Sequence, residues 1–272
     1  MTTPRLGRLG GFYVKTAGVA VSKEFQYRAT NYFLLATMVF EALLYLLLWQ
    51  AVARVAGGSV GGWTIHTLAA YFIVWTLVRN MTTATTPHDF EERIRDGTFT
   101  GALLRPIHPI HRDLAEYAGW KLVMVVLWVP VAVGLALIFR PALSVTPLEA
   151  VVFVVAIWAA YLLRSLYLWL LGLTSFWTTR AGAAFDLILA VELLLSGRLV
   201  PMSLLPGWAQ RVADFLPFKW VFGFPIESVV SNLSATDLLH GLAMQLVWIG
   251  VGATGVLGVW RLAVRRHTAV GN

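Results

Sequence analysis

Four ionisable residues lie inside stretches that are otherwise apolar, and their chemistry depends on what surrounds them. They are Glu41, Arg164, Asp186 and Glu192. A charge near the middle of a bilayer costs at least about 2.5–3.5 kcal/mol, so such groups usually pair or face water. At about 1.5 Å per residue, Glu41 and Arg164 both fall near mid-depth of their segments. We therefore expect a buried ion pair, Glu41–Arg164 or Glu192–Arg164, which either locks helices together or lies in a translocation path.

Three histidines could suggest a metal site, because His108 and His111 are three residues apart and His88 precedes them. Pro109 stands between the pair, however, and no third ligand is placed beside them. The chain has no cysteine for a thiolate site or a disulfide. We predict no metal site, and an intramembrane enzyme that acts on lipid is an alternative without supporting residues. The sequence also lacks the G-x-x-x-x-G-K-[ST] phosphate loop, so any ATP hydrolysis belongs to another polypeptide.

The most charged segment, residues 88–97, stands between two apolar stretches. Its side chains are His88, Asp89, Phe90, Glu91, Glu92, Arg93, Ile94, Arg95 and Asp96, followed by Gly97. Phe90 and Ile94 are four residues apart and share one face of a helix, which Gly97 can end. A short helix with one apolar face and charges of both signs fits a groove in a cytoplasmic partner. The alternative is a solvated helix in a loop.

The composition places the chain in a bilayer. Hydrophobic residues make up 58% and charged residues 13%, against about 45–50% and 25% in soluble domains. An apolar helix of about 20 residues crosses the hydrocarbon core. We expect an all-α membrane protein with one transmembrane domain over residues 1–272 and no soluble enzyme domain. The six expected spans are residues 32–53, 63–83, 120–139, 148–177, 183–196 and 239–260.

The net charge of +7 reflects membrane topology and not nucleic-acid binding. With six spans, most basic residues fall on one side, which the positive-inside rule makes cytoplasmic, together with both termini. These residues are Arg5, Arg8, Lys15, Lys23, Arg28, Arg93, Arg95, Arg105, Arg112, Arg180, Arg261, Arg265 and Arg266. The opposite side carries Arg54, Arg140, Arg198, Arg211 and Lys219.

Two further segments belong at the membrane surface. Residues 10–28 mix apolar and charged side chains, as an amphipathic helix lying among lipid headgroups does. Residues 199–222 alternate short apolar pieces with proline, glycine and tryptophan. None of these pieces can span, and aromatic residues favour the headgroup level. We therefore expect short re-entrant helices that form an outer gate.

The order of these elements resembles the membrane subunit of a type-2 ABC exporter, in the small six-span bacterial form that is encoded apart from its ATPase. The residues that carry the resemblance are Phe25-Gln26-Tyr27-Arg28-Ala29, Ile94-Arg95-Asp96-Gly97, Leu103-Leu104-Arg105-Pro106, Ser196-Gly197, Pro201, Leu205-Pro206 and Leu216-Pro217-Phe218. Nearly the whole chain takes part in it.

The resemblance implies a bacterial cytoplasmic-membrane protein in which two permease chains, identical or different, sit above two ATPase subunits. The ATPases bind ATP and Mg, and this chain holds no cofactor. ATP-driven closure pushes the coupling helix, residues 88–97, and the interfacial helix, and the spans open past the gate.

Spans two and five line the path in such exporters, which would place Thr82, Thr83, Leu189 and Glu192 near it. The threonine hydroxyls could instead only bond to helix carbonyls. An apolar path suits an amphipathic, lipid-like or drug-like substrate. The alternative function is a secondary transporter or channel, which should show inverted repeats or broken helices in both halves; only the second half is interrupted.

Overall fold

The computed structural model describes residues 6–26, 28–178 and 181–266. Arg5, Tyr27 and Arg180, which enter the charge pattern or the resemblance above, lie outside the described residues. The elements are α1 (Leu6–Gln26), α2 (Arg28–Val55), β1 (Ser59–Val60), β2 (Trp63–Thr64), α3 (Ile65–Met81), α4 (Pro87–Arg95), α5 (Thr98–Leu103), α6 (Pro109–Phe139), α7 (Pro147–Gly172), η1 (Leu173–Phe176), α8 (Ala181–Leu195), η2 (Met202–Leu204), α9 (Gly207–Asp214), α10 (Pro217–Val221), α11 (Gly223–Val230) and α12 (Ala235–Arg266). The protein is therefore an all-α membrane protein apart from one small hairpin.

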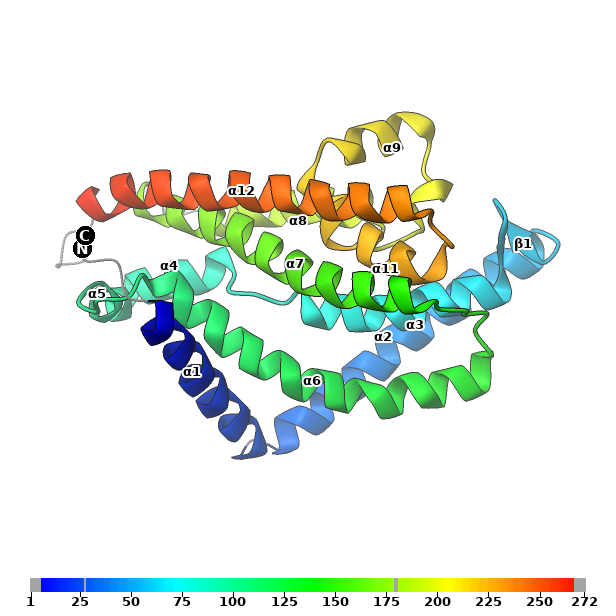
Figure 1. The fold of residues 1–272 in the computed structure, drawn as a ribbon, viewed down its shortest axis with the longest axis horizontal. Helices are drawn as coiled ribbons and strands as arrows, with labels where there is room; N and C mark the ends of the chain where they lie inside the picture. Colours follow the sequence, from blue (N-terminus) through cyan, green and yellow to red (C-terminus); the bar gives the residue numbers. More distant parts are fainter. Residues whose placement is uncertain (1–5, 27, 179–180, 267–272) are drawn as a thin grey trace.

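Within the described residues, four helices are long and apolar enough to cross a membrane. They cover Asn31–Val55, Pro109–Phe139, Pro147–Phe176 and Ala235–Arg265. Helices α6, α7 and α12 run along the long axis of the molecule, and α2 crosses it obliquely (Figure 1). Exposed apolar side chains cover these helices, among them Phe40, Leu137 and Val151. Such side chains suit contact with lipid.

The other two expected spans correspond to shorter helices. Helix α3 has 17 residues and α8 has 15. From Leu68 to Val78 every side chain of α3 is buried, because the helix packs against α2, α6 and α11. A helix that is apolar all round belongs in such a buried position. The six-span arrangement stays a prediction.

The end of the molecule opposite to α4 and α5 contains a hairpin and several short helices (Figure 1). Glycines at positive φ, including Gly57, Gly58 and Gly62, allow the turns that bring β1 and β2 together. The Nε1 of Trp49 donates a hydrogen bond to the Leu199 carbonyl at 3.1 Å. The Tyr71 hydroxyl donates to the Gly197 carbonyl at 2.7 Å. These bonds hold the chain between α8 and α9 against α2 and α3.

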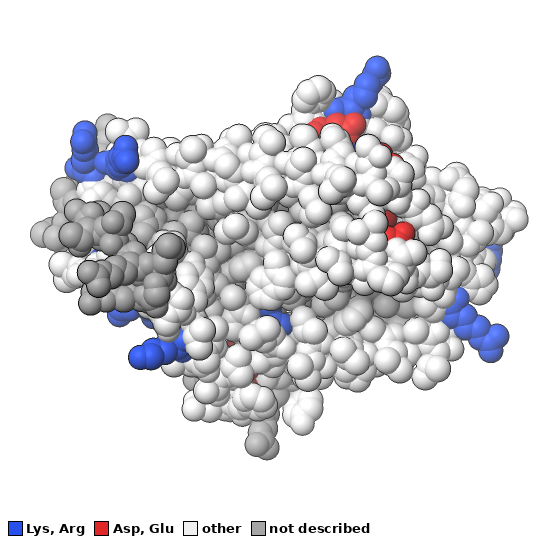
Figure 2. Space-filling model, viewed as in Figure 1, with Lys and Arg blue, Asp and Glu red and all other residues white. Residues whose placement is uncertain are grey.

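Most of the charged side chains on the face shown in Figure 2 lie toward the two ends of the long axis or on the projection at the top, and few lie in the middle. The beginning of α1, helices α4 and α5 and the last turns of α12 share one end (Figure 1). Helix α1 packs along the first half of α6: a Cβ on Gly119 would lie 2.4 Å from the Ala17 carbonyl oxygen. The amphipathic helix and the charged connector are thus neighbours.

Candidate functional site

The charged connector folds as α4, and local interactions define both of its ends. Thr86 caps the first turn: its Oγ1 accepts from the Asp89 backbone N–H, and the Asp89 carboxylate accepts from the Thr86 N–H at 2.6 Å. Pro87 takes the first helical position, where its missing N–H costs nothing. Gly97, with φ near 70°, forms the turn between the end of α4 and the beginning of α5. Residues within or next to α4 therefore define where the helix begins and ends.

One face of α4 is fixed to the membrane helices by Phe90. Its ring is fully buried and meets Trp169 of α7 edge to face at 4.7 Å. Gly172 makes room for it, because a Cβ there would lie 2.4 Å from the Phe90 ring. Ile94 lies against the same cluster. Phe90 and Ile94 therefore join α4 to the end of α7.

Polar contacts fix the same helix to α6 and α8. Both carboxylate oxygens of Asp113 accept from Arg93 at 2.9 Å, and the Trp169 Nε1 donates to one of them at 2.9 Å. The Glu91 carboxylate accepts from the Gly182 N–H at 2.6 Å. His88 lies 3.3 Å from Asp186 at the beginning of α8. Helix α4 thereby contacts α6, α7 and α8.

The remaining face of α4 is exposed, and it includes His88, although that side chain also contacts Asp186. Exposed side chains there are His88, Glu92, Arg95 and Asp96. Of the nine residues in the expected coupling segment, these form the accessible charged surface, while Phe90, Ile94 and Asp89 build and anchor the helix. We call these four exposed residues the α4 surface.

A second group of functional candidates is a buried ion cluster around Glu192 of α8. Its carboxylate lies 3.0 Å from Arg164 of α7 and 2.9 Å from Arg198, and it also accepts from the Tyr167 hydroxyl. Glu192 is 1% exposed, so its charge depends wholly on these partners. The two arginines also lie over the Phe222 ring, at 5.3 and 5.0 Å. The cluster joins α7, α8 and the segment that follows α8.

Of the two pairings that the sequence left open, the structure contains Arg164 with Glu192. The Glu41–Arg164 pair is wrong: Glu41 instead lies 2.8 Å from Arg79. The reason is packing, because α2 lies along α3, which carries Arg79, whereas Arg164 is on α7.

The residues expected along a path lie around this cluster. Thr82 is fully buried, its hydroxyl donates to the Val78 carbonyl at 2.8 Å, and its carbonyl accepts from Arg164 at 3.1 Å. The Thr83 hydroxyl lies 3.4 Å from the Arg79 carbonyl. Leu189 packs against the cluster that contains Tyr161 and Phe185. Both hydroxyls are thus bonded back to α3.

Sequence reasoning missed three interior cations and, among the interior acids, Asp113 and Glu149. Arg79 and Lys121 lie within segments that were treated as apolar, Arg198 was assigned to the outer surface, and Asp113 was not considered. Lys121 is fully buried: its Nζ donates to the Thr83 carbonyl at 2.5 Å and lies 3.9 Å from the centre of the Tyr161 ring. Their presence inside apolar stretches was the signal that could have found Arg79 and Lys121.

The histidines that could have suggested a metal site have other partners. The Ile110 N–H donates to the His108 Nδ1 at 3.3 Å, which caps α6, and His111 Nδ1 lies 2.9 Å from the Tyr13 hydroxyl. Burial, and secondarily His111, lowers the pKa of His108 to about 4. The neutral imidazole is therefore the form that fits this position.

Comparison with known proteins gives one result. The family model described as "ABC-2 family transporter protein" matches residues 36–271, which include all of α3 to α12. A search of curated proteins and a search of solved structures each returned no match.

Proposed function

This chain belongs to the ABC-2 family of transporter proteins, and we propose that it is the permease subunit of an ATP-driven exporter whose ATPase is a separate polypeptide. The permeases of this family are membrane subunits of transporters and not themselves enzymes. The finer parts of the proposal are the energy source, the direction of transport, the partners and the substrate.

The observation that carries the proposal is the two-sided construction of α4. Its inner face is tied to α6, α7 and α8 through Asp113, Trp169 and Gly182. Its outer face, the α4 surface, presents charges of both signs at the end of the molecule. A rigid element that is free on one side and bonded to three membrane helices on the other can transmit motion from a docked ATPase.

In this mechanism two ATPase subunits bind ATP with Mg and hold the α4 surface of each permease chain in a groove. When the ATPases close, α4 displaces the ends of α7 and α8, and α1 follows because it packs along α6. The Arg164–Glu192–Arg198 cluster then moves with α7 and α8. The chain between α8 and α11 opens toward the outside as the gate.

We propose that the substrate is amphipathic, lipid-like or drug-like, and that a second permease chain, identical or different, completes the path. Support comes from the apolar surface of α8, where Leu187 and Leu194 are 69% and 58% exposed. In this arrangement the second chain packs against α8, and the residues nearest the path are Thr82, Thr83, Leu189 and Glu192. We place the protein in a bacterial cytoplasmic membrane with both termini in the cytoplasm, in accordance with the positive-inside rule.

The test is co-purification of an ATPase with the full chain in mild detergent, followed by measurement of ATP hydrolysis. Reversing two exposed charges, Glu92→Lys with Arg95→Glu, should abolish co-purification because both side chains face away from the permease. The control reverses Arg211, which is exposed on α9 at the other end; Arg211→Glu should retain the ATPase. If the folded chain captures no ATPase, the proposed function is wrong and a secondary transporter or channel becomes the favoured function.

A further inference from the structure

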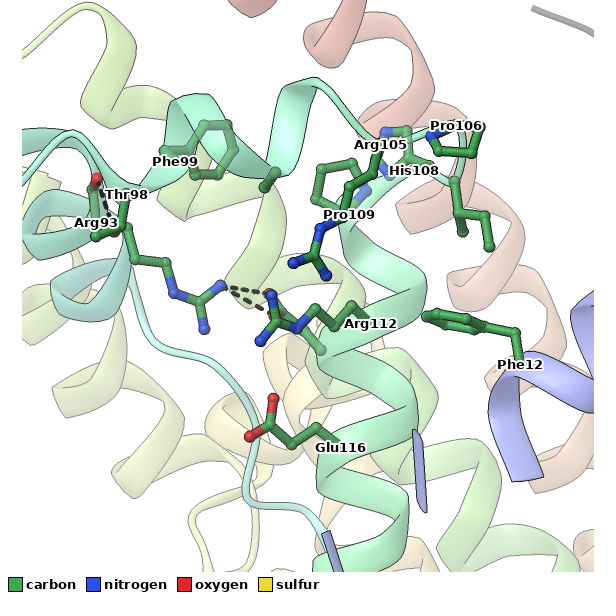
Figure 3. A pocket seen from close by; sticks show the side chains of 13 residues that line it. Phe12, Arg93, Thr98, Phe99, Arg105, Pro106, His108, Pro109, Arg112 and Glu116 are labelled. Carbon is green, nitrogen blue, oxygen red and sulfur yellow. Dashed lines mark hydrogen bonds and ion pairs between the residues drawn. The ribbon is translucent and has the colours of Figure 1, made fainter. Parts of the chain in front are cut away.

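A cavity of about 430 Å³ lies between α1, α5 and the first turns of α6, apart from the ion cluster. Phe12 of α1 reaches into it from one side, and Phe99, Pro106 and Ile107 line it from the connector. Figure 3 shows Arg105 and Arg112 extending toward the same region of this cavity. The site thus combines apolar walls with two guanidinium groups.

The charges that line the cavity are not balanced. Arg93 is paired with Asp113 at 2.9 Å, and Glu116 lies 3.9 Å from Lys23 of α1. Within the part of the chain that the structure describes, the side chains of Arg105 and Arg112 have no hydrogen-bond or ion-pair partner. A guanidinium group is always charged and presents a fork of donors that matches a phosphate or carboxylate. Two guanidinium groups in this cavity are therefore available to bind an anion.

The position of the cavity relative to the membrane indicates the source of an anion that binds there. Helix α6 has 31 residues, a length of about 46 Å at about 1.5 Å per residue. The hydrocarbon core is about 30 Å thick, and the uncharged part of the helix begins after Lys121. The first turns of α6, which carry Arg112 and Glu116, then project to the level of the lipid headgroups.

Helix α1 supports the same placement. Val14, Val19 and Phe25 are 74%, 69% and 67% exposed on it, whereas Tyr13 and Ala17 face α6. Exposed apolar side chains on an amphipathic helix that also carries lysines are typical of a helix lying in the membrane interface. A lipid molecule beside α1 would have its headgroup next to Arg105 and Arg112.

We propose that this cavity binds the phosphate group of an anionic phospholipid from the cytoplasmic leaflet. Arg105 and Arg112 hold the phosphate oxygens, while Phe12 and Ile107 contact the glycerol and the first methylene groups. The cytoplasmic position rests on the orientation given under the proposed function. The binding itself needs neither ATP nor an ATPase. Because α1, α5 and α6 all line the site, a bound lipid would tie the interfacial helix to the connector.

The experiment is native mass spectrometry of the full chain in detergent, titrated with phosphatidylglycerol or with phosphatidylcholine of the same acyl chains. We expect the wild-type chain to prefer phosphatidylglycerol by about tenfold or more. Both lipids carry the phosphate, but the quaternary ammonium of phosphatidylcholine makes its headgroup neutral and is repelled by the two guanidinium groups. Arg105→Gln with Arg112→Gln should remove this preference. Arg105→Lys with Arg112→Lys should keep part of it, because the charge remains and the fork is lost.

The matched control is Arg54→Gln with Arg140→Gln, which removes two exposed arginines at the opposite end and should keep the wild-type preference. Equal binding of the two lipids, or loss of the preference in this control, overturns the proposal. The proposal is also overturned if millimolar glycerol phosphate competes as effectively as the lipid, because the ligand would then be a soluble phosphate. Loss of the preference whenever an ATPase is bound would assign the arginines to a protein interface instead. None of these outcomes decides whether the chain is an exporter.

Discussion

At the scale of single residues, the most constrained group is the carboxylate of Glu192, which is 1% exposed and paired with two guanidinium groups. Glu192→Gln keeps the shape but leaves Arg164 and Arg198 buried without their counter-charge. Breaking a buried pair in this way costs about 3–5 kcal/mol. We expect a correspondingly lower thermal unfolding temperature in detergent.

The comparison for this variant is Glu116→Gln, whose side chain is 44% exposed and lies 3.9 Å from Lys23. An exposed pair contributes about 0–1 kcal/mol, so this change should leave the unfolding temperature nearly unaltered. Adding Arg198→Gln to Glu192→Gln should recover part of the lost stability, because one uncompensated cation is removed. Equal unfolding temperatures for Glu192→Gln and the wild type would contradict the ion cluster.

Phe90 is the residue through which α4 holds the membrane helices. Phe90→Ala removes a fully buried ring from its contact with Trp169, and such a change costs about 3–5 kcal/mol in a packed core. We expect α4 to become susceptible to limited proteolysis near Arg93 and Arg95 and the unfolding temperature to fall. The control is Phe215→Ala, since Phe215 is 81% exposed. If both variants are cleaved at the wild-type rate, Phe90 does not anchor the helix.

At the scale of elements, the beginning of α6 should make stability depend on pH. His108 caps this helix as a neutral acceptor, and its pKa in the fold is about 4. In the unfolded chain the pKa is about 6.5. The unfolded state therefore binds a proton first as the pH falls. The contribution of neutral His108 to the free energy of unfolding is complete above about pH 6.5 and is lost progressively as the pH falls toward 4.

The measurement is the thermal unfolding temperature in detergent between pH 7.5 and pH 4. His108→Asn supplies another acceptor that is favoured at a helix N-terminus and does not titrate in this range. This variant should lose less stability than the wild type over the interval. Parallel pH profiles for the two proteins would show that His108 does not titrate as its burial indicates.

The elements that sequence reasoning located best are those defined by local chemistry. The expected coupling segment, 88–97, overlaps α4 at Pro87–Arg95, because Phe90, Ile94 and Gly97 are signals within a few residues of one another. The partner of Glu41 was not predictable in this way. Several helices carry cations at a depth similar to that of Glu41, so depth alone does not identify its partner. The partner is Arg79 because α2 packs against α3.

The interior cations were missed for a related reason. An average over about 20 residues hides one charge among many apolar neighbours, and Arg79 and Lys121 both lie in such stretches. Arg198 was placed on the outer surface because it follows a span. The structure instead turns the chain after α8 back into the protein, where Tyr71 holds the Gly197 carbonyl.

At the scale of the whole molecule, the absence of cysteine allows the topology to be tested directly. The proposed function needs α4 in the cytoplasm and α9 outside, which requires α3 and α8 to cross the membrane although they are short. If only α2, α6, α7 and α12 crossed, the chain would not return between α2 and α4. Helix α4 would then lie on the outer side.

Single cysteines at Glu92 on α4 and at Trp208 on α9 distinguish these arrangements, because both side chains are exposed. With six spans, a membrane-impermeant maleimide labels Trp208→Cys in intact cells and labels Glu92→Cys only after permeabilisation. With four spans, Glu92→Cys reacts in intact cells as well. That result would place the α4 surface where no cytoplasmic ATPase can reach it, and it would also move the cavity at Arg105 and Arg112 to the outer leaflet.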